Sequence, residues 1–352
     1  MLYFESDYME GAHPEIMRRL AETNMEQTSG YGFDPYCEQA REMIKAACGV
    51  QDAAVYFAVG GTQANAAVID ALLKGWQGVL ASAAGHIAGH EAGAIEHCGH
   101  KVITLAHTSG KIAAETVQAY LASYYADAAH EHMPQPGAVY ISHPTEYGTL
   151  YTADELAAIH AVCKAHHIPL FVDGARLGYA LAADGTDVTL PVLAKNCEVF
   201  YIGGTKAGAL FGEAIVFTKP ELAAHFFSVM KQHGAVLAKG RLLGIQFQTL
   251  FTGDLYRTIC RRAIVTAHKL KQSFTECGFR LLMDTGTNQL FVILPNKTVK
   301  QLAKDIAFQI WEPYDSEHVV ARFTTSWATT EQAVDAAAEI LRRECELHAK
   351  EA

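Results

Sequence analysis

The sequence predicts an α/β fold: a mostly parallel sheet with helices on both faces, and a smaller α/β domain at the C-terminus. First, apolar runs typical of buried strands lie at 100–105, 138–142, 169–173 and 198–202. Second, helical stretches such as 153–166 separate these runs, which indicates crossover connections between parallel strands. Third, half of the residues are hydrophobic, so the chain can bury a large core.

The region after the last of these strands departs from the alternation. The apolar stretch at 213–218 follows the run at 198–202 too closely for a crossover helix, so we expect a strand antiparallel to its neighbour. From about 221 to 274 the sequence predicts long helices.

A smaller domain is expected beyond these helices. Its strands are predicted at 290–295 and 319–324, and a helix at 330–348 closes it. We therefore expect a large ligand-binding domain over 1–250, whose N-terminal segment contributes to the active site, and a small domain over 251–352.

Charge and composition exclude several classes of partner. The formal net charge is −10, which argues against nucleic acid and anionic membranes, because both require basic patches. No apolar run approaches the length of a membrane span, and the N-terminus lacks the pattern of a secretory signal, so we expect a cytoplasmic protein. The eight cysteines are widely spaced without a Cys-x-x-Cys, which indicates reduced thiols.

An aspartate and a lysine each follow an apolar run. Asp173 ends the run Pro-Leu-Phe-Val-Asp, and Lys206 lies 33 residues later in Tyr-Ile-Gly-Gly-Thr-Lys-Ala-Gly. Parallel strands deliver such residues to one edge of a sheet, where α/β proteins bind ligands. Pyridoxal 5'-phosphate (PLP) requires both types, a lysine amine for its Schiff base and a carboxylate that keeps the pyridine nitrogen protonated. Singly, Asp173 is also compatible with a helix cap and Lys206 with a solvated loop; together they favour a PLP site.

A glycine pair precedes an alanine-rich helical stretch. Gly60 and Gly61 follow an apolar element, and Thr62 is the expected helix cap. Free N–H groups at a helix N-terminus bind anions, so the cofactor phosphate is the expected ligand. A tight turn capped by threonine is the alternative.

His86 follows a short element at 79–82, so its imidazole can also lie at the sheet edge, flat on the pyridine ring. The alternative is a metal site, because His86 and His90 are four residues apart and Glu91 is adjacent. The order is not His-Glu-x-x-His and no third ligand falls at a diagnostic spacing, so we expect no metal.

These segments, in this order, resemble the low-specificity L-threonine aldolases, within the aspartate-aminotransferase-type (fold type I) PLP enzymes. The resemblance covers nearly the whole chain, and its most specific parts are 61–65 (Gly-Thr-Gln-Ala-Asn) and 173–176 (Asp-Gly-Ala-Arg). It implies a fold type I architecture with PLP as cofactor and an amino acid as substrate. It also implies a homo-oligomer, either a dimer or a dimer of dimers (a homotetramer), because this fold builds its pocket across a dimer interface.

The resemblance assigns roles to the motif residues. Lys206 is implied as the Schiff-base lysine, Asp173 as the pyridinium partner and His86 as the stacking ring. Gly61 and Thr62 are implied to hold the phosphate.

Four further residues are implied from other parts of the chain. Ser6, Arg176 and Arg322 would hold the substrate carboxylate or the phenolate oxygen of the cofactor. Arg241 matches a basic residue that reaches the phosphate from the neighbouring subunit.

One segment departs from the family pattern. Where the aldolases have Asn-Thr-His-Asn-Gly, residues 143–148 are His-Pro-Thr-Glu-Tyr-Gly, so Glu146 replaces the histidine proposed to help deprotonate the substrate hydroxyl. A buried carboxylate with a raised pKa can serve as that base, with His90 or a water as the alternative. Glu146 could equally anchor its own turn by accepting backbone N–H bonds.

The expected reaction is aldol cleavage of a β-hydroxy-α-amino acid, L-threonine or L-allo-threonine, to glycine and an aldehyde, with Lys206, His86 and Glu146 as catalytic residues. The alternative function uses the same cofactor but breaks a different bond. The protein would then be another PLP-dependent amino-acid lyase, a racemase or a transaminase acting through Cα–H cleavage. A non-catalytic PLP-binding protein is disfavoured, because it would need no arginines for a substrate carboxylate.

Overall fold

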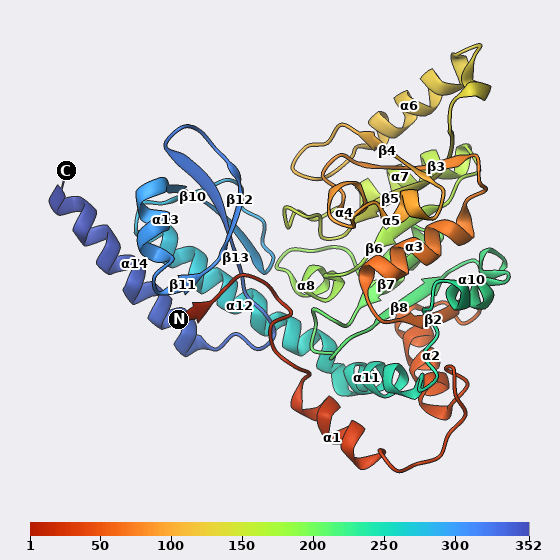
Figure 1. The fold of residues 1–352 in the computed structure, drawn as a ribbon, viewed down its shortest axis with the longest axis horizontal. Helices are drawn as coiled ribbons and strands as arrows, with labels where there is room; N and C mark the ends of the chain where they lie inside the picture. The colour runs from red at the N-terminus through yellow and green to blue at the C-terminus, as the bar shows by residue number, and fades with distance from the viewer. Residues whose placement is uncertain (352) are drawn as a thin grey trace.

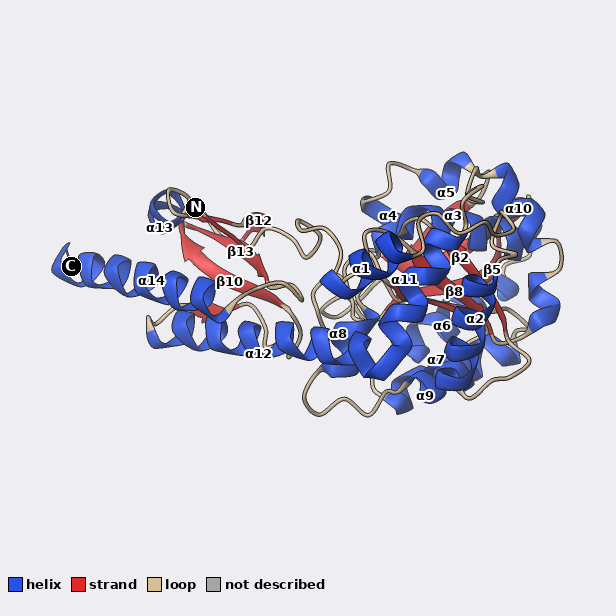
Figure 2. Ribbon diagram, turned by 90° about the horizontal axis from the view of Figure 1, so that it is seen from below, coloured by secondary structure: helices blue, strands red, loops and turns tan. Residues whose placement is uncertain are grey.

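The computed structural model describes residues 1–351 and divides into a large body and a small one (Figure 1). The large body contains a seven-stranded sheet and the small body a four-stranded sheet. Helix α12 (Leu255–Glu276) runs from the large body to the small one (Figure 2). Within the described residues, no helix is both long and apolar enough to cross a membrane.

The central sheet is parallel except for one strand. Its spatial order is β2 (Ala54–Ala58), β8 (Glu213–Phe217), β7 (Val199–Gly203), β6 (Leu170–Asp173), β5 (Gln135–Ser142), β3 (Gln77–Ser82) and β4 (Lys101–Leu105). Strand β8 runs antiparallel to both of its neighbours, as its position close behind β7 predicted. The first residue of β8 therefore lies at the edge where the other strands end.

Helices cover both faces of this sheet (Figure 2). They are α1 (Pro14–Glu22), α2 (Pro35–Cys48), α3 (Gly61–Leu72), α4 (His86–Gly89), α5 (Ala94–His97), α6 (Ala114–Ala126), α7 (Ala153–Ala165), α8 (Leu177–Ala182), α9 (Leu190–Lys195), α10 (Phe226–Gln232) and α11 (Arg241–Phe251), with short 3₁₀ turns η1 (His130–His132), η2 (Pro220–Ala223) and η3 (Thr252–Asp254). Successive side chains of a strand point to opposite faces. Accordingly, Val139 and Ile141 lie in one hydrophobic core and Ala138 and Tyr140 in the other.

The small body packs around a third core. Its sheet has the order β12 (Gln309–Pro313), β13 (His318–Thr324), β10 (Gln289–Pro295) and β9 (Arg280–Leu281), covered by α13 (Asn296–Leu302) and α14 (Glu331–Glu351). The chain's first strand, β1 (Leu2–Tyr3), pairs with β11 (Ile306–Ala307). Phe4 is buried in the same core as Leu270 and Leu290, so the N-terminal segment packs with this body.

The predicted α/β class and strands are confirmed, whereas β12 and the short strands β1, β9 and β11 were not predicted. Of the long helices predicted over about 221–274, α11 and α12 are present, but the chain before them forms only η2, the short α10 and a non-helical stretch at 233–240. One local expectation was wrong. Thr62 does not cap α3: the helix begins at Gly61, its N-cap is Gly60, and no side chain bonds to its free N–H groups. The N-terminus of α3 is therefore left open to a ligand.

Candidate active site

A cavity of about 290 Å³ lies at the carboxyl edge of the central sheet. Seven of the ten residues predicted for the site line it, namely Gly61, Thr62, His86, Glu146, Asp173, Arg176 and Lys206. They come from the ends of five strands, β2, β3, β5, β6 and β7, and from the turns that follow. The fold therefore brings together side chains that are far apart in the sequence.

Asp173, the last residue of β6, is held by hydrogen bonds to both carboxylate oxygens. The hydroxyls of Tyr140 and Tyr201 donate to it from the two neighbouring strands, and the N–H of Ala175 donates at 2.9 Å. Burial raises the pKa of Asp173, but His86 and the two phenol hydrogen bonds lower it more, so the net shift is downward. Asp173 thus remains ionised in a dry site, as a partner for a pyridinium requires.

His86 is joined to Asp173 through a buried polar chain. Its Nδ1 donates to Glu91 Oε1 at 2.7 Å, since a carboxylate oxygen only accepts. Asn65 donates from its side-chain nitrogen to the same Glu91 oxygen at 2.7 Å and to Asp173 Oδ2 at 3.0 Å. Glu91 therefore orients the imidazole. Among the described residues, no group of three or more His, Cys, Asp or Glu side chains is placed to hold a metal ion.

Glu146 lies on the loop after β5 and lines the cavity. Its Oε1 accepts the backbone N–H of His86 at 2.7 Å and the hydroxyl of Ser142 at 2.6 Å. Burial raises the pKa of Glu146, and these donors only partly oppose the shift. The carboxyl group is therefore fixed in place, and burial shifts its equilibrium towards the protonated form.

Arg176 follows β6 and is paired with Asp7 of the N-terminal segment. Its Nε and Nη2 donate to the two Asp7 oxygens at 2.7 and 3.1 Å, and Asn288 also donates to Asp7 at 2.9 Å. Asp7 is fully buried. Arg176 therefore brings a balanced charge to the cavity rather than an unpaired cation.

Lys206 lies three residues beyond the end of β7, on the turn that leads to β8. Burial lowers the pKa of its amine and the nearby Arg176 lowers it further, while Asp7, Asp173 and Glu213 oppose the shift. The amine lies 5.9 Å from the centre of the Tyr8 ring. A lysine with a lowered pKa is more often neutral, which is the form that attacks an aldehyde.

The cavity also suits a phosphate group. Gly61 and Thr62 line it at the start of α3, where no side chain caps the free N–H groups. A Cβ atom at Gly61 would lie 2.9 Å from the Tyr201 hydroxyl, so only glycine leaves that approach open. With the lysine, the buried carboxylate and the imidazole, the residues present fit PLP.

The remaining three predicted residues do not line the cavity within this chain. Arg322, on β13, donates to the side chains of Gln289 and Gln309 and lies under the Trp311 ring. Its Nε is buried without a partner among the described residues, and burial lowers its pKa to about 10. An unpaired guanidinium N–H in a buried position suits a carboxylate ligand.

Arg241 and Ser6 lie outside the cavity in different ways. Arg241 begins α11 and donates to the backbone carbonyls of Thr23 and Glu26, so within its own chain it does not reach the cavity. Ser6 immediately precedes the buried Asp7 in the segment between the two bodies.

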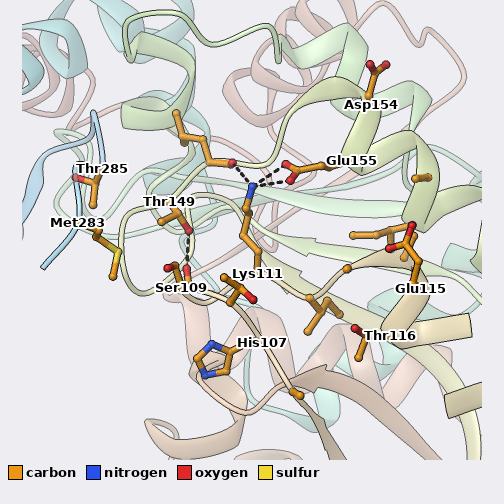
Figure 3. Close-up of a pocket in the computed structure, with 18 of the residues that line it drawn as sticks. His107, Ser109, Lys111, Glu115, Thr116, Thr149, Asp154, Glu155, Met283 and Thr285 are labelled. Carbon is orange, nitrogen blue, oxygen red and sulfur yellow. Dashed lines mark hydrogen bonds and ion pairs between the residues drawn. The ribbon is translucent and has the colours of Figure 1, made fainter. Parts of the chain in front are cut away.

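A larger cavity of about 950 Å³ lies away from Lys206, between the start of α6, the start of α7 and residues 283–285 (Figure 3). Its lysine, Lys111, is bound to both oxygens of Glu155 at 2.6 and 2.8 Å. The hydroxyl of Thr149 donates to the carbonyl of Ser109 at 2.7 Å. This cavity contains none of the residues predicted for the site.

Several residues of the site were missed by the sequence reasoning: Asp7, Tyr8, Asn65, Glu91, Tyr140, Tyr201 and Glu213. One of them has a detectable signal, because Glu213 places a carboxylate at the start of an otherwise apolar strand. Glu91 lies five residues after His86 and was considered only as a metal ligand. The remaining residues join the site through contacts between distant segments, which a single sequence does not reveal.

Comparison with known proteins agrees with this geometry. Residues 4–297 match the sequence profile of the family described as beta-eliminating lyase. The low specificity L-threonine aldolase of Pseudomonas aeruginosa is 30% identical over 330 residues, 93% of each chain, and that of a Pseudomonas species is 29% identical over 334 residues, 94% of each chain.

Solved structures give the same result. The threonine aldolase of Leishmania major superposes with a TM-score of 0.95 at 40% identity, over 98% of this chain and 100% of that one. Aspartate aminotransferase from Thermus thermophilus has a TM-score of 0.71 at 15% identity, over 97% of this chain and 91% of that one, a likeness of fold alone. The fold type I architecture is confirmed, and the chain belongs to the beta-eliminating lyase family.

Proposed function

We propose that this enzyme cleaves L-threonine or L-allo-threonine to glycine and acetaldehyde. It is a PLP-dependent lyase. The observation that carries the proposal is that Lys206 and Asp173 line one cavity with His86 and the open N-terminus of α3. The activity named for the Pseudomonas and Leishmania relatives supports the choice of substrate.

Bound PLP, attached through its aldehyde to the Lys206 amine, supplies an electron sink for the bond cleaved at the substrate Cα. We assign Asp173 to the ring nitrogen, because its carboxylate is ionised and lies in a dry site. We assign His86 to the ring face, and Glu91 holds the imidazole at a fixed angle. Gly61 and Thr62 are assigned to the phosphate through their backbone N–H groups.

The substrate carboxylate is assigned to Arg322. The Nε atom of Arg322 is buried and has no hydrogen-bond partner among the described residues, so it can donate to a ligand. In Arg176, by contrast, two N–H groups already donate to Asp7. Arg176 and Ser6 then act beside Arg322 at the same carboxylate or at the cofactor's phenolate oxygen. Holding the carboxylate sets the rotation about the Cα bonds and so decides which bond is cleaved.

Glu146 is assigned as the base that takes the proton of the substrate hydroxyl. Its position is fixed by Ser142 and the His86 N–H, and its pKa, which burial raises, makes it a stronger base than an exposed carboxylate. The same two donors support the alternative in which Glu146 only anchors the loop. In that case the reaction is another Cα-centred PLP reaction or uses His90 or water as the base.

We also propose a homo-oligomer, a dimer or a dimer of dimers, that works in the cytoplasm. Phe33 is 68% exposed and Tyr31 is 45% exposed on the loop beside Ala238 and Arg241, as expected of a surface that a second subunit covers. Arg241 would then reach the phosphate of the neighbouring subunit. For the domains we propose a large unit over 1–250 and a small one over 251–352, with residues 2–4 of the N-terminal segment packed against the small unit. Light scattering of the purified protein tests the oligomer.

The reaction is tested by incubating the purified PLP-loaded enzyme separately with L-threonine, L-allo-threonine, phenylserine and serine. We expect glycine and the matching aldehyde from the β-hydroxy substrates. In parallel, borohydride reduction and peptide mass spectrometry should place the cofactor on Lys206. Pyruvate or a keto acid as the main product, or racemised substrate, would instead establish the alternative reaction class.

A further inference from the structure

A second buried carboxyl group lines the cavity that contains Lys206. Glu213 is the first residue of β8, and because this strand is antiparallel its side chain lies at the same sheet edge as the ends of β7 and β2. It pairs in register with Gly203 and Ala58 and lines the cavity that contains Lys206.

The turn that carries Lys206 holds this carboxyl group in place. The backbone N–H of Gly204 donates to Glu213 Oε2 at 3.1 Å, and the Thr205 hydroxyl also bonds to the carboxyl group. The same hydroxyl oxygen accepts the N–H of Gly212 at 3.0 Å. The two residues that precede Lys206 therefore bind Glu213, so the positions of the amine and the carboxyl group are coupled through one short turn.

The groups around Glu213 favour the exchange of a proton with Lys206. Burial raises the pKa of Glu213 to about 8; the Thr205 hydroxyl and Lys206 lower it, whereas Asp173 raises it. The other titratable groups that face Glu213 are the phenols of Tyr201 and Tyr256, whose pKa values burial raises well above the usual range. Both phenols stay neutral, so Glu213 is the neighbour that changes charge near neutral pH.

Lys206 has a matching environment. Burial and Arg176 lower the pKa of its amine, and the carboxylates of Asp7, Asp173 and Glu213 raise it. Asp7 is committed to Arg176, and Asp173 accepts bonds on both oxygens. Of the three, Glu213 alone has a raised pKa, so it can release and accept a proton without disrupting an ion pair.

We propose that Glu213 is the proton partner of Lys206: its carboxyl group holds the proton that the lysine nitrogen gains and loses during turnover. The inference rests on the proposed function, which requires Lys206 to leave the cofactor and return to it. When the lysine is released as a neutral amine, the Glu213 carboxylic acid gives its proton to that amine, leaving a carboxylate and an ammonium group. The reverse transfer restores the acid and the neutral amine that attacks again.

The test is a pH titration of the visible absorption of PLP in the holoenzyme, comparing wild type with Glu213→Gln. The glutamine amide oxygen can still accept the Gly204 N–H, but the amide cannot ionise to a negative charge. An ionised carboxylate stabilises the protonated form of the lysine nitrogen. Removing this carboxylate in Glu213→Gln should therefore lower the midpoint of the absorbance titration by about one pH unit or more. Glu213→Asp keeps an ionisable carboxyl group, so its midpoint should lie close to that of wild type.

The matched control is Glu198→Gln. Glu198 precedes β7 at the opposite edge of the same sheet, where it accepts the Leu170 N–H at 2.9 Å and contacts His160. Its substitution should leave the midpoint unchanged. An equal midpoint in Glu213→Gln, Glu198→Gln and wild type overturns the inference. If Glu213→Gln fails to fold by circular dichroism, Glu213→Ala, which also lacks the ionisable group, takes its place, and a midpoint in that variant identical to wild type overturns the inference equally.

Infrared spectroscopy of the ¹³C-glutamate-labelled holoenzyme adds a readout that does not depend on activity. A protonated-carboxyl band should change over the same pH interval as the visible absorption and be missing from Glu213→Gln. The band should persist in Glu146→Gln, and its loss there instead of in Glu213→Gln overturns the assignment. If wild type does not cleave threonine while the Glu213 shift is observed, the proposed function fails and the proton pairing stands.

Discussion

Asp7 and Arg176 form a bidentate ion pair that connects the N-terminal segment to the edge of the central sheet, although the two residues are 169 positions apart in the sequence. Residues 2–4 before Asp7 pack with the small body through β1 and Phe4, and Asn288 of that body donates to Asp7. One buried carboxylate therefore joins both bodies beside the cavity. It also balances the charge of Arg176, which supports the proposal that Arg322 binds the substrate carboxylate.

Replacing Asp7 by alanine should destabilise the protein strongly, because Arg176 would remain buried without its partner. The loss of one member of a buried pair costs about 3–5 kcal/mol. Urea unfolding measures the change. Asp305→Ala, which removes an exposed pair with Arg343, is the control and should have little effect. Equal stability of the two variants would refute the structural role of Asp7.

The same ion pair predicts a pH dependence of stability. Burial raises the pKa of Asp7, but Arg176 and Lys206 lower it more, so its pKa in the folded state is below that in the unfolded state. The stabilisation is then fully present above the unfolded pKa, about 3.9, and is lost as the pH falls through the folded pKa. The stability difference between wild type and Asp7→Ala should therefore shrink in acid, measured by unfolding at a series of pH values.

Lys206→Ala should abolish turnover and the borohydride-reducible bond to PLP, because the cavity is lined by no other lysine among the described residues. Lys231→Ala is the control: this lysine lies over the Tyr31 ring at 4.3 Å, away from the cavity, and the variant should retain a reducible cofactor. Mass spectrometry of the reduced peptides reads out both. Cofactor found at one other lysine of the Lys206 variant would show that the assignment is wrong.

Asp173→Asn should retain PLP but lower kcat by about a hundredfold or more. A neutral amide cannot stabilise a pyridinium, and losing a charge-assisted contact in a dry site costs roughly 2–4 kcal/mol. The substitution also disturbs the hydrogen bonds from Tyr140 and Tyr201. Tyr201→Phe separates the two effects, because it removes one donor and keeps the charge; its loss of kcat should be much smaller. Near-normal turnover of Asp173→Asn would contradict the pairing with the ring.

The sequence predicted those site residues whose type the cofactor requires and whose position at the end of a strand can be seen in the sequence. Asp173 and Lys206 follow apolar runs, and both line one cavity as expected. Asp7 was missed because tertiary contacts alone bring it to the site. Glu91, five residues after His86, was considered only as a metal ligand and not as the partner of the imidazole. The cap at Thr62 was predicted from local preference, yet the helix begins one residue earlier and leaves its N–H groups uncapped, as an anion site requires.

Arg322→Ala should raise KM for amino acids far more than it changes PLP affinity, because the proposed partner of its buried guanidinium is the substrate carboxylate. Arg322→Lys keeps a charge without the planar fork and should restore only part of the affinity. Steady-state kinetics and PLP titration of the cofactor-free variants measure the two quantities. Loss of PLP with an unchanged KM would place Arg322 at the cofactor instead.

Glu146 decides between aldol cleavage and the alternative reactions. As the base it must be ionised, so kcat should fall as the pH drops through its pKa, which burial raises above the usual range. Glu146→Gln should then remove this acidic limb and slow threonine cleavage by about two to four decades.

The anchoring alternative predicts a different pattern. In Glu146→Gln the new amide oxygen can still accept the His86 N–H and the Ser142 hydroxyl, so an anchor alone would be largely preserved. Ser142→Ala weakens the anchor without removing the carboxyl group, which makes it the matched comparison. Exchange of the glycine α-proton requires no hydroxyl base, so in Glu146→Gln it should be far less affected than cleavage. Equal losses in cleavage and exchange, or an unchanged pH profile, would leave Glu146 as an anchor and return the choice of base to His90 or water.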